Sequence, residues 1–343
     1  MTESRSHPGF LRQGLALFGL LLFLFFALIL GVGVGAVQVP PSEVLRALLG
    51  LSENPVLTEL RLPRVLGGAL VGGSLALAGA AFQGLFRNSL ADPYLMGSAS
   101  GAALGVTLYA LFAGALSPAF AQHAVFSSLP LSATLAGFLG ALFAVGLTLV
   151  LAGGAARTHD LVLAGVVVGS VFTGLTTYLM MQDADRVRAV FAYTLGNLAF
   201  LGWPGVKALA LFGLLSSPLF LFGRVLNALA LGEEVAKSLG LPLEALKLFL
   251  IALVALLTAA AVAQAGIIGF VGLITPHLLR RLLGDDYRLI LPASFLGGAA
   301  FLVLADLLAR TLTRPAELPV GVVTTLLGGP FFLYLIWRGR GRA

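Results

Sequence analysis

The chain has 343 residues, of which 59% are hydrophobic and only 10% are charged, and its mean hydropathy is +1.01. Soluble domains carry about 25% charged residues, so this composition excludes an ordinary soluble protein and predicts a chain that crosses a membrane many times. The sequence contains no cysteine, which excludes disulfides, iron–sulfur clusters and thiol catalysis. The net charge of +6 is expected to follow membrane topology and not to form a nucleic-acid-binding surface.

Apolar segments long enough to be helical spans recur along the whole chain, without a soluble domain or long linker between them. The first lies behind Arg5 and Arg12, and its length favours an uncleaved span over the alternative, a signal peptide. We predict an all-α, polytopic helical bundle in which residues 1–343 form one transmembrane domain. The ten predicted spans are 14–37, 65–86, 93–113, 129–152, 161–181, 203–222, 245–265, a short span broken by proline at 267–283, 289–309 and 318–337.

The distribution of positive charge predicts the orientation of these spans. If both termini are cytoplasmic, only eight of the 21 Lys and Arg residues face outside, which agrees with the positive-inside rule. These eight form three clusters, which suggests a surface for an acidic partner; the alternative is side chains that reach lipid head groups from span ends. The clusters are Arg46, Arg61 and Arg64; Arg186, Arg188 and Lys207; and Arg310 and Arg314.

A polar helical segment, residues 227–243, separates two long apolar runs. Leu231, Val235 and Leu239 recur at helical spacing, and Gly232 and Gly240 can end the helix on either side. Its charged residues would not be tolerated in lipid, so we place it in water at the cytoplasmic face. It is either an ordinary connecting loop or the contact for an external energy source, because the chain shows no energy source of its own.

Glycines at four-residue spacing predict close helix packing. Small residues at this spacing let helix backbones approach one another in lipid. We expect packing within one bundle, with a homodimer contact as a further alternative, and spans two to five and seven to ten could be inverted repeats. The glycine sets are Gly68 and Gly72; Gly97, Gly101 and Gly105; and Gly165 and Gly169.

The sequence contains no recognisable catalytic, nucleotide-binding or metal-binding motif. There is no phosphate-binding loop, and the four histidines lie far apart, so we predict no ATPase activity, no metal site and no cofactor. Asp306 is the one carboxylate well inside a predicted span, and Arg310 follows one turn later, so a local ion pair explains it better than proton coupling. The sequence therefore argues against an enzyme and against a self-powered pump.

Four sequence blocks, in order, resemble the membrane permeases of iron-siderophore, haem and cobalamin importers. The first includes RLPR at 61–64 and RNSLADPYLMG at 87–97; the others are 229–243, GIIGFVGLITPHLLR at 266–280 and ADLLARTLTRPAELPVGV at 305–322. The resemblance covers nearly the whole chain. One departure is Ser89, where the family usually has proline.

This resemblance implies one subunit of a type II ATP-binding-cassette (ABC) importer. Two permease copies, here expected to be a homodimer, would form a central path in the cell membrane, two cytoplasmic ATPases would drive it, and an extracytoplasmic binding protein would deliver the cargo. The segment 227–243 would be the coupling helix that contacts the ATPase. Its expected contact residues are Ala230, Leu231, Gly232, Glu233, Glu234, Lys237, Leu239 and Gly240.

The resemblance also implies roles at both membrane faces. Arg61, Arg64 and Arg310 would bind carboxylates of the binding protein, since a guanidinium holds a carboxylate in a two-pronged pair. A cytoplasmic gate would use Asn88, Ser89, Leu90, Thr158 and His159. Small and hydroxylated side chains of span five would line a wide path; these are Gly165, Gly169, Ser170 and Thr173.

The cargo is left open by the sequence among siderophore-bound iron, haem and cobalamin, with an iron chelate favoured as the commonest cargo of this family. Two other classes stay open at this point. An ion-coupled secondary transporter would depend on protons or sodium without ATP, and a structural or assembly membrane protein would not copurify with an ATPase.

Overall fold

The computed structural model describes residues 10–35, 39–51, 54–116, 131–155, 157–182, 190–313 and 316–340, and every regular element in these ranges is helical. A π-helical turn at Val56–Arg61 leads into α3, and a 3-10 turn at Ser217–Phe222 follows α9. The helices are α1 (Phe10–Gly33), α2 (Pro41–Leu48), α3 (Leu62–Leu85), α4 (Ser98–Leu116), α6 (Leu131–Leu151), α7 (Thr158–Met181), α9 (Trp203–Leu215), α10 (Gly223–Ala230), α11 (Glu233–Ser238), α12 (Leu243–Ala265), α13 (Val271–Leu283), α14 (Tyr287–Thr311) and α15 (Val320–Arg340).

The predicted helical, polytopic membrane protein is confirmed, but its spans are unequal in length. Within the described ranges, seven helical runs are long and apolar enough to cross a membrane: Gln13–Gly33, Val56–Leu85, Ala133–Leu151, Thr158–Met181, Trp203–Ala230, Leu243–Ala265 and Tyr287–Thr311. The other three predicted spans correspond to the shorter apolar helices Ser98–Phe112 and Val320–Tyr334 and to α13, which has 13 residues.

Two predicted helix boundaries are wrong for identifiable reasons. Span eight was expected to be short and to begin at residue 267, but Gly266 and Phe270 have positive φ angles of 72° and 68°, which keeps the chain out of helix until Val271. Pro276, which was expected to break this span, lies inside the continuous helix α13. Span six is not one helix either, because α9 ends at Leu215 and the Ser217–Phe222 turn, with Pro218 in its first positions, separates it from α10.

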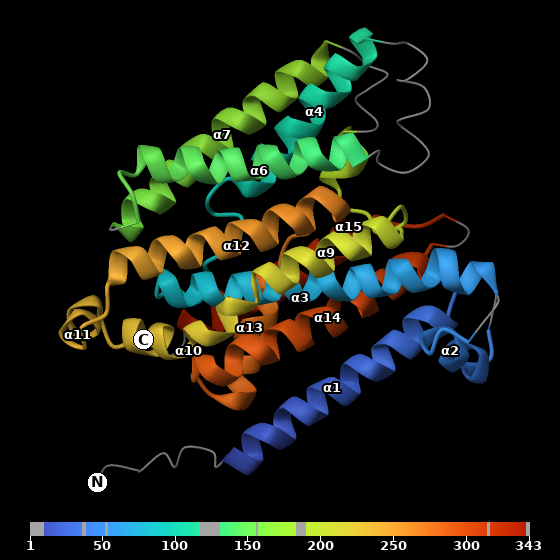
Figure 1. Cartoon of the computed structure of the whole chain (residues 1–343), viewed down its shortest axis with the longest axis horizontal. Coiled ribbons are helices and arrows are strands. Elements are labelled where there is room, and N and C mark those ends of the chain that lie inside the picture. The colour runs from blue at the N-terminus through green and yellow to red at the C-terminus, as the bar shows by residue number, and fades with distance from the viewer. Residues whose placement is uncertain are drawn as a thin grey trace.

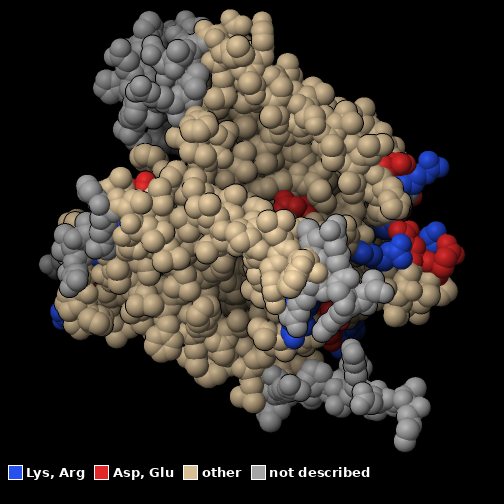
Figure 2. Space-filling view, turned by 180° about the vertical axis from the view of Figure 1, so that it is seen from behind, with Lys and Arg blue, Asp and Glu red and all other residues tan. Residues whose placement is uncertain are grey.

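Helix α3 runs through the middle of the bundle (Figure 1), and most of its residues are buried. Helices α4, α6 and α7 stand together along one edge, and α1 lies along the opposite edge (Figure 1). The outer faces of α1, α6 and α7 expose large apolar side chains, including Phe26, Phe143 and Leu163, as expected for surfaces in contact with lipid or another apolar partner. Figure 2 shows that uncharged residues cover most of one face.

The predicted close packing is confirmed within this chain for Gly72, Gly101, Gly105 and Gly165, but not for Gly169. A Cβ atom at Gly101 of α4 would collide with the carbonyl oxygen of Gly140 in α6, and one at Gly72 of α3 would collide with the carbonyl oxygen of Gly298 in α14. The backbones of these helix pairs therefore lie in direct contact, which no larger residue would permit. Four-residue spacing in the sequence predicted Gly72 and Gly101, but not their partners Gly298 and Gly140.

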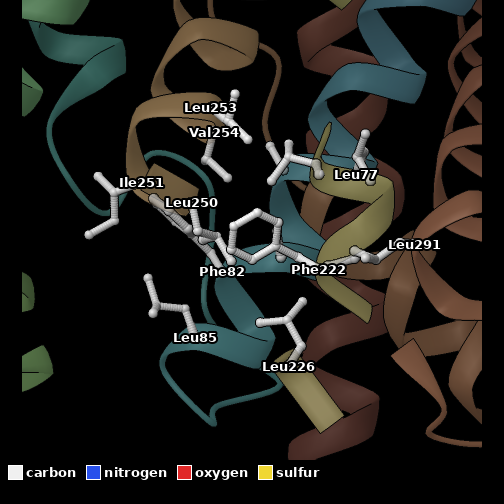
Figure 3. Packing of buried hydrophobic residues seen from close by; sticks show 14 of the residues in the cluster. Leu77, Phe82, Leu85, Phe222, Leu226, Leu250, Ile251, Leu253, Val254 and Leu291 are labelled. Atoms are coloured by element: carbon white, nitrogen blue, oxygen red, sulfur yellow. The ribbon is translucent and has the colours of Figure 1, made fainter. Parts of the chain in front are cut away.

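The two ends of the bundle carry different short helices. The α11 end carries α10, α11 and the start of α1, and the C-terminal end of the chain lies there too; the α2 end carries α2 and the end of α1 (Figure 1). Near the α11 end, a large apolar core joins α3, α10, α12 and α14. Figure 3 shows Phe82 of α3 and Phe222, the last residue of the 3-10 turn before α10, lying among Leu226, Leu250 and Leu291. This core fixes α10 to the membrane helices.

Candidate functional site

A cleft of 1130 Å³ lies between α7, α4 and the turn that precedes α4. Its wall is mainly apolar and also carries glycines and several hydroxyl groups, and its lining residues include one carboxylate, that of Asp92. The turn at Pro93–Gly97 shapes one side, because Tyr94 donates a hydrogen bond of 3.1 Å to the carbonyl oxygen of Ile268. Figure 2 shows a hollow between the part of the molecule with α4, α6 and α7 and the larger remainder.

All four residues predicted for the transport path lie on the wall of this cleft. Gly165, Gly169, Ser170 and Thr173 come from successive turns of α7, and Thr176 and Thr177 continue the same face. A Cβ atom at Gly169 would meet only Ser100 Oγ, at 3.6 Å, so the wall has free space at this point. Asp92 was not predicted to line the cleft, because it belongs to the predicted loop between two spans.

The residues predicted as a gate lie in two turns at the α11 end. Asn88, Ser89 and Leu90 are exposed in the turn after α3, where Asn88 Oδ1 accepts a 2.9 Å hydrogen bond from the backbone N–H of Leu90. Thr158 and His159 begin α7, next to the exposed pair of Arg157 with Asp160. The two turns share an end of the bundle but lie outside the lining of the cleft.

The predicted coupling segment forms two short helices, α10 and α11, joined at Gly232. Gly232 has a φ of 120° and Gly240 a φ of 77°, so both glycines bound α11 as predicted. Leu231 and Leu239 are 72% and 64% exposed, and Ala230 is exposed beside them. Exposed leucines next to charged residues are typical of a docking surface outside the membrane.

The charged residues of α11 have different surroundings. Glu234 is 94% exposed and lies 3.9 Å from Lys237, as expected for a polar rim. Glu233 instead points back to the bundle, where its carboxylate lies 2.8 Å from Lys247 Nζ of α12. Lys247 is only 2% exposed. Glu234 and Lys237 are therefore exposed for contact with a partner, whereas Glu233 is paired within the chain.

A second polar contact ties α10 to the turn between α13 and α14. Asn227 donates a 2.8 Å hydrogen bond to Asp286 Oδ1 and accepts one of 2.9 Å from the backbone N–H of Tyr287. Asp286 also caps the start of α14 and pairs with Arg288 at 2.7 Å. Hydrogen bonds from Arg288, and then from Asn227, lower the pKa of Asp286 to about 2.

At the α2 end, the three arginines predicted to bind a partner are engaged within the chain. Arg64 and Arg310 share the carboxylate of Asp306, at 2.9 and 3.0 Å, so the predicted Asp306–Arg310 pair is confirmed. Arg64 also pairs with the exposed Glu317 at 2.8 Å.

Arg61 and Arg310 also bind the end of α1. Arg61 donates to the carbonyl oxygen of Val32 at 3.1 Å, and Arg310 donates to that of Gly31 at 2.9 Å. The last carbonyls of a helix lack partners within the helix and carry partial negative charge, so two cations stabilise this end. Of the other outer positive residues, Arg186, Arg188 and Arg314 lie outside the described residues.

Comparison with known proteins places these features in one family. The FecCD transport family matches residues 21–338. The hemin transport system permease protein HmuU of Yersinia pestis is 40% identical over 335 residues, which are 94% of this chain and 95% of that protein. The vitamin B12 import system permease protein BtuC of Klebsiella pneumoniae subsp. pneumoniae is 36% identical, over 95% of this chain and 94% of that protein. A solved inward-facing structure assigned to the metal-chelate type of ABC transporter is 30% identical, with a TM-score of 0.80 over 95% of this chain and 99% of that one.

Proposed function

The chain belongs to the FecCD transport family and is the permease subunit of an ABC importer, and we propose that its cargo is an intact iron chelate or cobalamin. It is a multi-pass membrane protein and is not itself an ATPase. The family assignment removes the ion-coupled secondary transporter and the assembly protein from consideration.

The observation that supports a large cargo is the cleft on α7. Its 1130 Å³ exceeds the roughly 300–1,000 Å³ of ordinary small-molecule pockets. Its wall is mainly apolar, with glycines, scattered hydroxyl groups and Asp92 as its one charged lining residue, so a bulky cargo would meet few strong contacts that could trap it. We propose that this wall is one half of the transport path and that a second copy of the chain supplies the other half.

We propose that the α11 end faces the cytoplasm and that α10 and α11 receive the ATPase. The positive-inside distribution supports this orientation, and the exposed Leu231 and Leu239 supply the apolar contact. The turns with Asn88 and His159 lie at the same end, where the path must close to the cytoplasm, so we assign the gate to them.

The α2 end would then face the extracytoplasmic binding protein. A carboxylate of that partner can reach the arginine cluster most easily at Arg64, whose pairing with the exposed Glu317 can be exchanged for another carboxylate. Arg61 and Arg310 would support docking indirectly, because they hold the end of α1 beside Arg64.

The proposal is tested by uptake into proteoliposomes that contain the permease, its ATPase and its binding protein. We expect ATP-dependent uptake of a ferric siderophore, haem or cobalamin by the wild-type complex. Gly169→Leu, which fills the cleft, should reduce uptake at least tenfold, while Val167→Leu on the exposed side of α7 should not. Equal uptake by both variants would contradict the assigned path, and uptake of none of the three cargo classes would contradict the proposed function.

A further inference from the structure

Helix α11 is held to the bundle by little apolar packing. Ala236 is its one buried residue, with no exposed surface, and joins the core near Leu229 and Leu243. A Cβ atom at Gly232 or Gly240 would meet no atom within 4 Å, so neither junction of α11 is packed against the bundle. A helix attached in this way can change its angle at low energetic cost, because few contacts would have to be broken.

Helix α10, in contrast, is attached to the bundle by both apolar packing and hydrogen bonds. Leu226 and Leu229 are buried in the core shown in Figure 3, and Asn227 binds Asp286 and Tyr287 at the start of α14. A force on the α10–α11 pair will therefore move α11 more readily than α10.

The buried side chain of Lys247 gives α11 one strong polar attachment. Lys247 is in the first turn and a half of α12, and its Nζ donates to Glu233 Oε1 at 2.8 Å. A charge-assisted hydrogen bond of this length, with one partner almost fully buried, resists separation better than the exposed contact between Glu234 and Lys237 at 3.9 Å.

Helix α12 connects this attachment to the cleft. It runs without interruption from Leu243 to Ala265, which corresponds to about 34 Å of helix, and Ile267 just beyond its end lines the cleft. The same end carries the carbonyl oxygen of Val262, which accepts a 2.8 Å hydrogen bond from Tyr193, and Ala265, which accepts from the backbone of Asn197 at 2.8 Å. A shift of α12 would thus reach the wall of the cleft.

We infer that the Glu233–Lys247 ion pair transmits movement of α11 to α12, and through α12 to the wall of the cleft. This inference rests on the proposed function, because it takes α11 as the element that an ATPase moves. Glu233 and Lys247 are positioning residues. Glu234, the neighbour of Glu233, is left to face the ATPase.

The experiment measures cargo imported per ATP hydrolysed by the complete complex in proteoliposomes, with copurification of the ATPase as a second readout. Glu233→Gln and Lys247→Met should each lower this ratio at least fivefold while the ATPase still copurifies. The matched control Glu244→Gln removes an exposed carboxylate from the first turn of α12 and should stay within twofold of the wild type.

The charge-swapped chain, Glu233→Lys with Lys247→Glu, distinguishes transmission of movement by the ion pair from a loss of coupling caused by misfolding. We expect it to recover at least half of the wild-type ratio, because it restores attraction between the same two positions. A wild-type ratio in Glu233→Gln would overturn the inference, as would a swapped chain that inserts normally yet couples no better than either single variant. Failure of the wild-type complex to import cargo with ATP would instead refute the proposed function.

Discussion

Replacing Asp306 by Asn removes one negative charge from the buried cluster at the α2 end with almost no change of shape. Arg64 and Arg310 lie 2.9 and 3.0 Å from this carboxylate, and the three side chains are only 12%, 6% and 4% exposed. Breaking a buried ion pair by removing one partner costs about 3–5 kcal/mol. Arg64 keeps Glu317, so the lower figure applies, and we expect a loss of about 3 kcal/mol.

Thermal unfolding of the purified protein in detergent measures this loss. At about 2 °C per kcal/mol for a chain of this size, Tm should fall by about 6 °C. Adding Arg310→Met to Asp306→Asn removes the uncompensated cation and should recover part of the loss. The reasoning is refuted if Asp306→Asn leaves Tm within 1 °C of the wild type, because the arginines would then not depend on this carboxylate.

Two further predictions concern packing and pH. Gly101→Ala should destabilise the protein by about 1–3 kcal/mol, because its Cβ would meet Ala144 Cβ at 2.5 Å. The control is Gly146→Ala on α6, where an added Cβ would meet no atom within 4 Å and the effect should be neutral or stabilising. Equal Tm values for the two variants would contradict the packing. The lowered pKa of Asp286, about 2 against 3.8, means that its stabilising effect is present above about pH 4 and is lost as pH falls towards 2. The Tm difference between wild type and Asp286→Asn should therefore be constant from pH 8 to 5 and shrink below pH 4, and a difference that persists at pH 2 would contradict this assignment.

Apolar runs were sufficient to predict the membrane helices and their order, but not the short helix α2. Long apolar runs predicted the seven full-length spans. Gly232 and Gly240 predicted both ends of α11, because positive φ angles favour glycine. The turn from Gly266 to Phe270 was not predictable in this way. Phe270 adopts a positive φ that its residue type disfavours, and only tertiary contacts can impose it.

The residues expected to line the path share one helix face, whereas contacts between distant segments were not predicted. Gly165, Gly169, Ser170 and Thr173 share one face of α7, so their common position on the cleft follows from helical spacing. The partners Lys247 for Glu233 and Glu317 for Arg64 lie 14 and 253 positions away in the sequence. No local pattern joins residues at such separations, and for this reason the pairing of Glu233 within the chain was not predicted.

Docking at the α2 end can be separated from stability through Glu317. Its carboxylate is 46% exposed and occupies one edge of the Arg64 guanidinium, whereas Asp306 holds the buried edge. If a partner's carboxylate takes the place of Glu317, then Glu317→Gln removes a competitor and should tighten binding up to about fivefold at low salt, because exposed pairs contribute about 0–1 kcal/mol. Tm should hardly change in this variant.

Titration of the binding protein against the permease in nanodiscs measures the change in affinity. Arg46→Gln is the control for a general loss of charge at this end. Weaker binding by Glu317→Gln would show that Glu317 itself contacts the partner, and an effect confined to Arg46→Gln would place docking on α2 instead.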